Sequence, residues 1–290
     1  MEETLASMPV RPCLPIHDSR TVSLSVTIIT KNEEAAIRRC LQSVAWADEI
    51  VVVDSGSTDR TLEVCHEHGA KVQQTSDWPG FGPQKNRALA LAGGDWVLSL
   101  DSDEWVTPEL RAEIERAMAA PGGVAAFRMP RRSSFCGRFM RHSGWWPDYV
   151  VRLFRRGSAR FSDDLVHERV IVNGTIEKLR APILHEAVRD LHGMVAKTNN
   201  YSTASAVMRH GRGQRGSLTA AILHGLWAFL RTYFLRLGFL DGREGFMLAV
   251  INAENSYYRY AKLMMLAKRE TGNREQEMGN ANPPPSQPSL

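Results

Sequence analysis

The feature that most constrains the fold is an alternation of wholly apolar strands with helix-like segments in the first hundred residues. Continuous apolar or β-branched runs occupy Leu24–Thr30, Glu49–Asp54 and Trp96–Asp101, and a weaker run follows Lys71. The segments between them carry apolar residues at helical spacing, as in residues 34–44. Strands that are apolar throughout are buried on both faces. The pattern therefore predicts a mostly parallel sheet with helices on both faces.

A different pattern begins after residue 120. Short apolar runs are separated by turn residues such as Asn173-Gly174, which predicts a short antiparallel region; the runs are 124–132, 148–156, 166–172 and 175–186. From about Asp190 to Lys268 the spacing is helical again.

Polar residues follow three of the predicted strands directly. They stand at Thr30–Glu33, Asp54–Asp59 and Asp101–Glu104. Ligands of open α/β sheets bind at the carboxyl ends of the strands, so this coincidence predicts a binding site at that edge. Asp101 and Asp103 would share one face of an extended chain, and such carboxylates repel unless a cation such as Mg²⁺ or Mn²⁺ lies between them. The alternative is a loop with solvated acids, and Glu104 also suits a helix N-terminus.

The absence of two common motifs argues against a dinucleotide site and against a phosphate-binding loop. Neither the dinucleotide-binding pattern GxGxxG nor the phosphate-binding pattern GxxxxGK[ST] occurs, so a metal on Asp103 would have to balance a diphosphate. The four cysteines lack paired spacing, which favours a reducing cytosol. The first 22 residues lack the apolar core of a signal peptide and predict a loose leader.

Positive charge and apolar residues each gather in one place. Nine arginines and a single acid, Asp148, lie between Arg128 and Arg160, which predicts an anionic partner: phosphate, an acidic membrane or nucleic acid. The window Ser217–Leu240 approaches the length of a membrane span, but His224, Arg231 and Arg236 interrupt it. We expect a helix buried in protein or lying at a membrane surface.

Several motifs together resemble one family. They are "VTIITKNEEAAIRRCLQSV", "EIVVVDSGSTDRT", "FGPQKNRALALAGGDWVLSLDSDEWVTPEL" and "LVHERV", and "GFLDGREGF" accompanies them near the C-terminus. In this order they resemble the family 2 glycosyltransferases of GT-A fold, in particular the branch with bacterial lipopolysaccharide core glucosyltransferases. The resemblance implies a GT-A domain at 23–188, with a donor half to about 120 and an acceptor half from 121. Composition and spacing predict the rest: a leader at 1–22, a helical region at 189–271 and a disordered tail at 272–290.

The resemblance also implies roles for residues of the donor half. Asp54 would receive the base or ribose of a nucleotide sugar, with Thr30 and Glu33 in the same pocket. Asp101 and Asp103 match the family's DxD positions: Asp103 would bind the metal directly, and Asp101 would contact the ribose or support the metal. Contacts to the donor would also come from Lys85, Asn86 and Arg87, although a solvated helix face is the alternative for Lys85 and Arg87.

In the acceptor half the resemblance implies a carboxylate acting as general base. Glu168 matches the family's His-Glu pair, and Asp148 is the second candidate; an ion pair with an arginine is the alternative for Glu168. His167 and His185 could orient these carboxylates or be structural.

The function implied is an inverting, metal-dependent transfer of a hexose from a nucleoside diphosphate sugar to a hydroxyl. We expect glucose, a UDP-sugar and a lipid-linked glycan acceptor such as a lipopolysaccharide core intermediate. The enzyme would be cytoplasmic and peripheral on the inner membrane, without a nucleic-acid partner. The alternatives are a nucleotidyltransferase, which also needs paired carboxylates and a divalent metal, and a module that binds nucleic acid or another anion.

Overall fold

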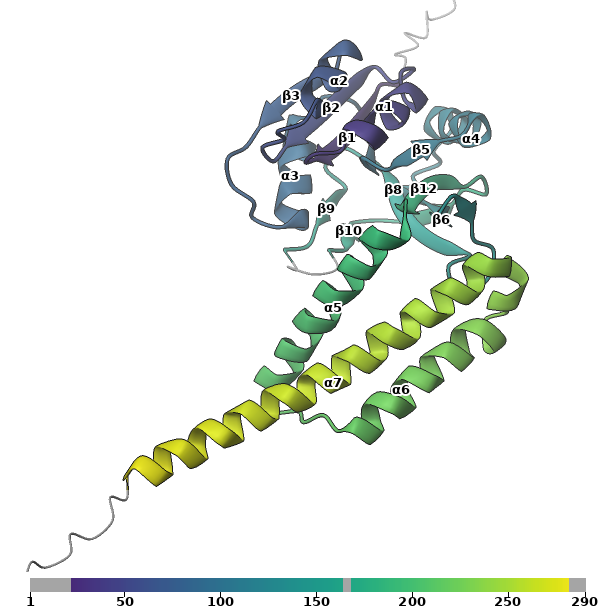
Figure 1. Ribbon diagram of the computed structural model, residues 1–290. Helices are drawn as coiled ribbons and strands as arrows, with labels where there is room; N and C mark the ends of the chain where they lie inside the picture. Colours follow the sequence, from purple (N-terminus) through teal and green to yellow (C-terminus); the bar gives the residue numbers. More distant parts are fainter. Residues whose placement is uncertain (1–21, 164–167, 282–290) are drawn as a thin grey trace, which may run out of the picture.

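The computed structural model describes residues 22–163 and 168–281. Its first four strands are those expected, namely β1 (Leu24–Thr30), β2 (Glu49–Asp54), β3 (Lys71–Gln74) and β4 (Trp96–Asp101). They pair in parallel in the order β3-β2-β1-β4 (Figure 1). The helices between them are α1 (Glu34–Ser43), α2 (Thr61–Glu67) and α3 (Phe81–Leu91).

Helices cover both faces of this sheet. Apolar residues of β1, such as Ile28, pack with Ile37 of α1 and Val64 of α2 in the main core. The same core includes α4 (Pro108–Ala119), which follows the short strand β5 (Glu104–Val106). On the opposite face Ala88 of α3 packs against β1 and β2. The expected α/β fold with helices on both faces is therefore confirmed.

The strands after residue 120 extend the same sheet. Its full order is β3-β2-β1-β4-β8-β6-β12-β5, where β6, β8 and β12 are Ala126–Phe135, Asp148–Arg155 and Ile183–Val188. Only part of the predicted antiparallel pairing is found. β8 runs antiparallel to β4 and β6, whereas β12 and β11 (Ile176–Lys178) run parallel to β6.

The strands on either side of the turn residues Asn173-Gly174 do not pair with each other. The preceding strand β10 (Val170–Val172) pairs instead with β9 (Ala159–Phe161) in a separate two-stranded sheet. The following strand β11 joins β6, as does the short strand β7 (Arg138–Phe139). A turn dipeptide fixes only the local backbone, and here both flanking strands find other partners.

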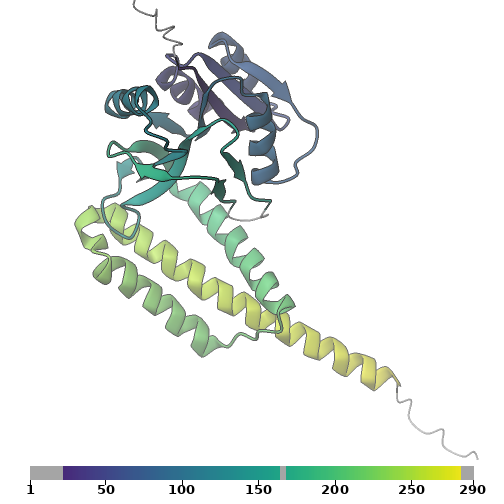
Figure 2. The same ribbon diagram turned by 180° about the vertical axis from the view of Figure 1, so that it is seen from behind.

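The C-terminal region is an arm of helices that extends away from the sheet (Figures 1 and 2). It comprises α5 (Leu191–Gly211), α6 (Leu218–Leu230), the π-helical turn η1 (Arg231–Leu235), the 3₁₀ turn η2 (Gly238–Asp241) and α7 (Gly242–Ala281). α7 continues ten residues past the expected boundary at 271. Most of the expected leader and residues 282–290 of the expected tail lie outside the described residues.

One stretch of the described residues, Leu218–Leu235, is long and apolar enough to cross a membrane, and 17% of it is buried. The alternative of a helix buried within this chain is therefore wrong. Exposed side chains include Leu223, Leu226, Trp227 and Leu235, and Leu235 is 65% exposed.

Candidate functional site

The three polar strand ends meet at one edge of the sheet. In the parallel register Thr30 pairs with Asp54, and Ile29 pairs with Asp101. The carboxyl ends of β1, β2 and β4 are therefore adjacent, as the sequence predicts. A site at this edge can draw on side chains from all three strands.

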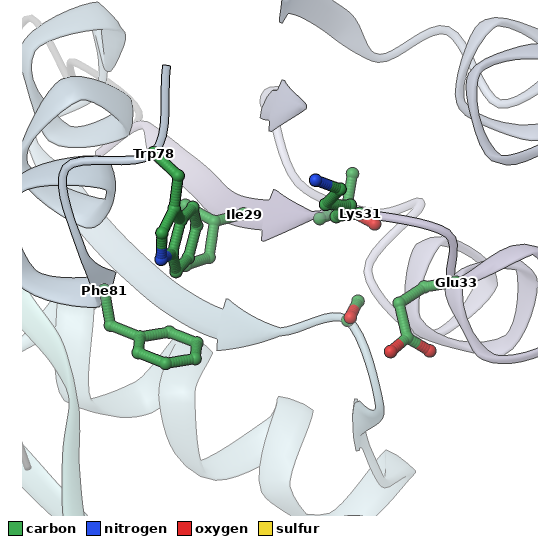
Figure 3. A pocket seen from close by; sticks show the side chains of 7 residues that line it. Ile29, Lys31, Glu33, Trp78 and Phe81 are labelled. Carbon is green, nitrogen blue, oxygen red and sulfur yellow. The ribbon is translucent and has the colours of Figure 1, made fainter. Parts of the chain in front are cut away.

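A pocket of about 380 Å³ opens at this edge (Figure 3). Its lining residues are Ile29, Thr30, Lys31, Glu33, Trp78, Phe81 and Ser102. Trp78 and Phe81 form an edge-to-face pair with ring centroids 4.9 Å apart. Both rings are about half exposed, so they offer aromatic surface to a planar ligand. The Thr30 hydroxyl is buried and has no hydrogen-bond partner among the described residues.

Glu33 lines the same pocket and lies beside a cation. Arg189 donates a hydrogen bond to its carboxylate at 2.9 Å. Burial raises the pKa of Glu33, and Arg189 offsets only part of that effect.

Asp54 lies at the expected edge, but its side chain is fully buried. Its carboxylate accepts hydrogen bonds from the backbone N–H groups of Gly56 and Ser57, both at 2.9 Å, and from the Ser57 hydroxyl. In this structure Asp54 shapes the loop after β2. A contact with a nucleotide would require some of these bonds to be exchanged.

Asp101 is held between two buried cations. Lys85 on α3 and Arg152 on β8 contact its two carboxylate oxygens at 2.8 and 2.5 Å. Burial alone would raise the pKa of Asp101, but the positive charges of Arg152 and Lys85 outweigh burial and hold it well below its usual range. The solvated-face alternative for Lys85 is wrong, since this residue is only 4% exposed.

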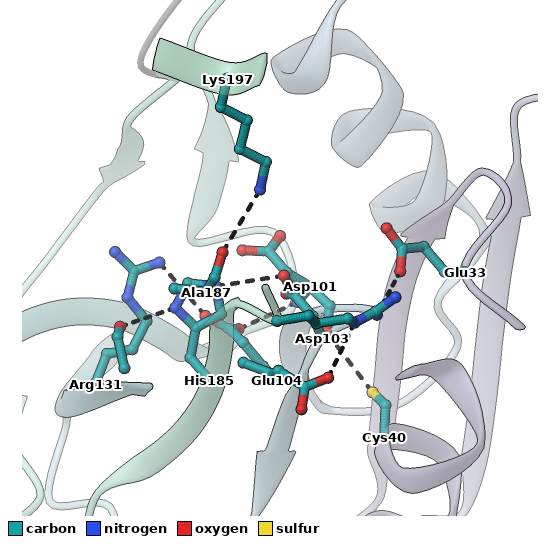
Figure 4. A network of polar contacts seen from close by, with 12 residues as sticks. Glu33, Cys40, Asp101, Asp103, Glu104, Arg131, His185, Ala187 and Lys197 are labelled. Atoms are coloured by element: carbon teal, nitrogen blue, oxygen red, sulfur yellow. Dashed lines mark hydrogen bonds and ion pairs between the residues drawn. The ribbon is translucent and has the colours of Figure 1, made fainter. Parts of the chain in front are cut away.

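Asp103 has a different partner. The strand alternation expected for Asp101 and Asp103 stops at Asp101, because Ser102 and Asp103 form a turn between β4 and β5. The Asp103 carboxylate lies 3.4 Å from Nε2 of His185 on β12, and the His185 Nδ1 is 2.9 Å from the Ser133 hydroxyl (Figure 4). Ser102, which lies between the two aspartates, lines the aromatic pocket described above.

The Asp103 and His185 side chains fit a divalent metal ion. A carboxylate is a ligand of Mg²⁺ and Mn²⁺, and an imidazole is a common ligand of divalent transition metals. The hydrogen bond from the other ring nitrogen would fix the orientation of the imidazole. Among the described residues there is no group of three or more His, Cys, Asp or Glu side chains placed to hold a metal. The remaining ligands would have to be phosphate oxygens and water, as is usual for Mg²⁺ at phosphate sites.

The two candidate bases, Glu168 and Asp148, pair with different cations. Glu168 forms an ion pair with Lys85 at 2.8 Å, so the ion pair that was the alternative to a catalytic role is found, with a lysine as the cation. Asp148 forms an ion pair with Arg131 at 2.7 Å. Its carboxylate is 44% exposed.

Asp148 also lines a second pocket, of about 290 Å³, which we call the β6–β8 pocket. It is formed by Arg131, Ser133, Gly144, Trp145, Pro147, Asp148, His185 and Ala187. Because His185 belongs both to this pocket and to the pair with Asp103, the pocket adjoins the candidate metal ligands.

The other predicted donor residues make structural contacts. Arg87 forms two hydrogen bonds with the exposed carboxylate of Asp77, at 2.8 and 2.7 Å. The Asn86 amide bonds the backbone N–H and C=O of Phe161, which ties α3 to β9. His167 lies outside the described residues.

Sequence reasoning missed Arg152, Trp78 and Phe81. Arg152 is 5% exposed and also contacts Glu104 at 2.7 Å. The sequence counted it only as one of the clustered arginines, although its place within the apolar strand "YVVRLF" signals a buried charge. Among the described residues, three of the nine clustered arginines pair with acids of the chain itself, namely Arg131, Arg138 and Arg152. The cluster is therefore not wholly available to an external anion.

Comparison with known proteins identifies the family. The model of glycosyl transferase family 2 matches residues 25–173. An uncharacterised glycosyltransferase of Rickettsia typhi is 32% identical over 84% of this chain and 87% of its own. The lipopolysaccharide core biosynthesis glycosyltransferase LpsC of Rhizobium meliloti is 30% identical over 82% of this chain and 93% of its own.

Similarity to solved structures is weaker. One similar structure is TarS of S. aureus, crystallised as residues 1–349 with UDP-GlcNAc. The match covers 86% of this chain and 92% of TarS, with 16% identity and a TM-score of 0.44. This likeness is too remote to assign a ligand. The family model and the full-length relatives confirm the resemblance seen in the motifs. The chain belongs to glycosyltransferase family 2.

Proposed function

We propose that this glycosyltransferase moves a glucosyl group from a UDP-sugar, with inversion, to a hydroxyl of a lipid-linked glycan such as a lipopolysaccharide core intermediate. The observation that carries the proposal is the pairing of an aromatic pocket with an Asp103–His185 pair at the same sheet edge. The name of the LpsC relative supports the choice of acceptor. Family membership sets aside the nucleotidyltransferase and the nucleic-acid-binding module.

The donor would lie across the carboxyl ends of β1 and β4. Trp78 and Phe81 would contact the base, and the free Thr30 hydroxyl would bond a polar group of the nucleoside. Asp103 and His185 would hold Mg²⁺ or Mn²⁺, which when bound stabilises the negative charge of the leaving diphosphate. Lys85 and Arg152 would keep Asp101 ionised beside it.

The chemistry is a single displacement. The acceptor oxygen bonds to the anomeric carbon as the bond from that carbon to the diphosphate breaks. A carboxylate takes the proton of the acceptor hydroxyl, a role that contributes about 10²–10⁴-fold. We assign this role to Glu168, whose carboxylate shares Lys85 with Asp101; Asp148, in the β6–β8 pocket, is the second candidate.

A panel of nucleotide sugars tests the donor assignment. Purified enzyme is incubated with UDP-, GDP- and ADP-glucose and with UDP-GlcNAc, each with Mn²⁺, with Mg²⁺ and with EDTA, and the released nucleoside diphosphate is measured. We expect release from UDP-glucose that needs a divalent metal. The proposal is contradicted if as much nucleoside diphosphate is released in EDTA as with metal, or if only a nucleotide sugar other than UDP-glucose releases it.

We also propose that the enzyme works at the cytoplasmic face of the inner membrane, with α6 and η1 lying on the anionic leaflet. The support is an exposed apolar face that includes Trp227 and Phe234, next to the exposed Arg231 and Arg236. Apolar side chains would enter the acyl region, and each arginine near the surface would contribute about 1 kcal/mol.

Sedimentation with liposomes tests this surface. Wild-type protein should pellet with vesicles containing anionic lipid at low salt and be released as salt rises. Leu223→Asp combined with Trp227→Asp should abolish pelleting, whereas Leu91→Asp, which changes an exposed leucine on α3 of the sheet domain, should not. Wild-type protein that stays in the supernatant at low salt counts against membrane binding.

A further inference from the structure

The segment "GFLDGREGF" surrounds a buried carboxylate. Asp241, at the end of η2, is 1% exposed. It accepts hydrogen bonds from the backbone N–H groups of Arg141 and His142 at 3.0 and 2.9 Å, and from the Ser143 hydroxyl at 3.1 Å. Nδ1 of His142 lies 3.3 Å away. Every one of these partners belongs to the loop between β7 and β8, about a hundred residues earlier in the chain.

The glycines of the segment allow it to fold tightly on itself and to approach the loop closely. A Cβ on Gly245 would lie 1.9 Å from the Gly238 carbonyl oxygen and 2.9 Å from Cβ of Asp241. A Cβ on Gly238 would lie 3.1 Å from the Ser143 hydroxyl. Only glycine fits at these positions, so the segment is shaped to seat Asp241 against the loop.

The loop needs this support because its backbone is strained. Ser143 has a φ of 59°, which is uncommon for a residue other than glycine. The Ser143 N–H donates at 2.8 Å to the carbonyl of Arg236, which lies between η1 and η2. The loop is therefore bonded to the arm at both Arg236 and Asp241. Strained backbone persists where the surrounding contacts over-determine it.

The same loop forms one wall of the β6–β8 pocket. The next residues after Ser143 include Gly144, Trp145 and Pro147, which line that pocket. Trp145 also packs in an apolar cluster with Phe135 of β6 and Leu248 of α7. The position of this wall therefore depends on contacts made by the C-terminal arm.

We propose that Asp241 is a positioning residue that holds the 141–147 loop so that the β6–β8 pocket can receive a sugar of the acceptor. This rests on the proposed function. An indole such as Trp145 can stack on the apolar face of a sugar, and the Arg131–Asp148 pair can bond its hydroxyls. The arm would then shape the acceptor site as well as lie on the membrane.

Hydrogen exchange tests the positioning role without any acceptor. Asp241→Asn keeps the shape but replaces one accepting oxygen with a donating NH₂ group, so at least one of the bonds from residues 141 and 142 is lost. We expect exchange of peptides over 140–147 to be at least tenfold faster. The control is Asn252→Ala, which removes a 3.2 Å bond to Thr232 within the arm and should leave this loop unchanged. Unchanged loop exchange in Asp241→Asn overturns the proposal.

Ser143→Ala is a milder variant that removes a single donor to Asp241, and it serves if Asp241→Asn does not fold. It should accelerate exchange in the same peptides by a smaller factor. If the 140–147 peptides exchange at the same rate in Asp241→Asn, Ser143→Ala and Asn252→Ala, a specific role for Asp241 is contradicted.

Kinetics separate positioning from general damage. With UDP-glucose as donor and octyl β-D-glucoside as acceptor, Asp241→Asn should raise the acceptor KM at least fivefold while the Kd for UDP with Mn²⁺ changes less than twofold. A parallel loss of UDP binding would indicate a merely structural role and overturn the proposal. Wild-type enzyme that binds UDP but does not use the glycoside contradicts the sugar assignment. Wild-type enzyme that binds no UDP contradicts the proposed function, and the exchange data still decide the role of Asp241.

Discussion

Glu49, at the start of β2, should stabilise the fold in a strongly pH-dependent way. It stands at the amino end of the strand, away from the candidate site. Its carboxylate accepts hydrogen bonds from the Lys71 ammonium and the Ser25 hydroxyl, both at 2.5 Å, and from the Gly93 N–H at 2.8 Å. Burial raises the pKa of Glu49, but these three donors outweigh burial and lower it from 4.5 to about 2.

The size of the effect follows from this difference. A pKa that is lower in the folded state by about 2.5 units corresponds to about 3 kcal/mol of stability at pH 7. Because the folded pKa is depressed, the contribution is complete above the unfolded pKa and falls as the pH drops toward the folded value. At pH 3 less than half of it would remain.

Urea unfolding of wild type and Glu49→Gln at pH 7, 5, 4 and 3 measures this contribution. We expect the two free energies of unfolding to differ by about 3 kcal/mol at pH 7 and by less than half of that at pH 3. The control is Glu67→Gln, which removes an exposed ion pair with Arg38 and should cost under about 1 kcal/mol. A Glu49→Gln difference that is the same at pH 7 and pH 3 would refute the reasoning.

Three further predictions concern the site. Asp103→Ala should abolish transfer with Mn²⁺ or Mg²⁺ while circular dichroism stays unchanged, because a metal ligand is lost without disturbing the core; near-normal turnover would remove Asp103 from the metal site. Glu168→Gln should keep donor affinity and slow transfer by about 10²–10⁴-fold, and a loss confined to Asp148→Asn would move the base to Asp148. Trp78→Ala should weaken UDP binding by about 1 kcal/mol, or roughly fivefold, in calorimetry; unchanged affinity would exclude a contact between Trp78 and the base.

Much of the fold could be predicted because it depends on local patterns. The four parallel strands are continuous apolar runs, and Thr107 and Pro108 begin α4 as sequence rules predict, with the Thr107 hydroxyl accepting from the Leu110 N–H. The meeting of Thr30, Asp54 and Asp101 follows from parallel pairing alone, since equivalent strand ends share an edge.

The partners of the site residues could not be predicted, because they come from distant parts of the chain. Asp101 meets Lys85 through the packing of α3 and Arg152 through the antiparallel insertion of β8 beside β4. No spacing in the sequence states that β8 takes this place. The separation of Asp101 from Asp103 depends on a two-residue turn, which breaks the alternation assumed for an extended strand.

The two candidate bases stand at opposite ends of one chain of ion pairs. Between the contacting side chains its distances are 2.5–3.5 Å, and it runs in the order Glu168, Lys85, Asp101, Arg152, Glu104, Arg131, Asp148. Neighbouring charges couple, so the effects of changes within one network do not simply add. Neutralising Asp148 would let Arg131 draw closer to Glu104, and Arg152 would pass that change on to Asp101.

A slow Asp148→Asn enzyme would therefore not prove that Asp148 takes the proton. The double variant Glu168→Gln with Asp148→Asn resolves this. If Glu168 alone is the base, Asp148 affects the reaction only through acceptor binding and the chain of ion pairs. At saturating acceptor the kcat of the double variant should then be no lower than that of Glu168→Gln. If each carboxylate contacts a reacting group independently, the two losses in kcat should multiply. Multiplied losses would contradict the assignment of a single base at Glu168.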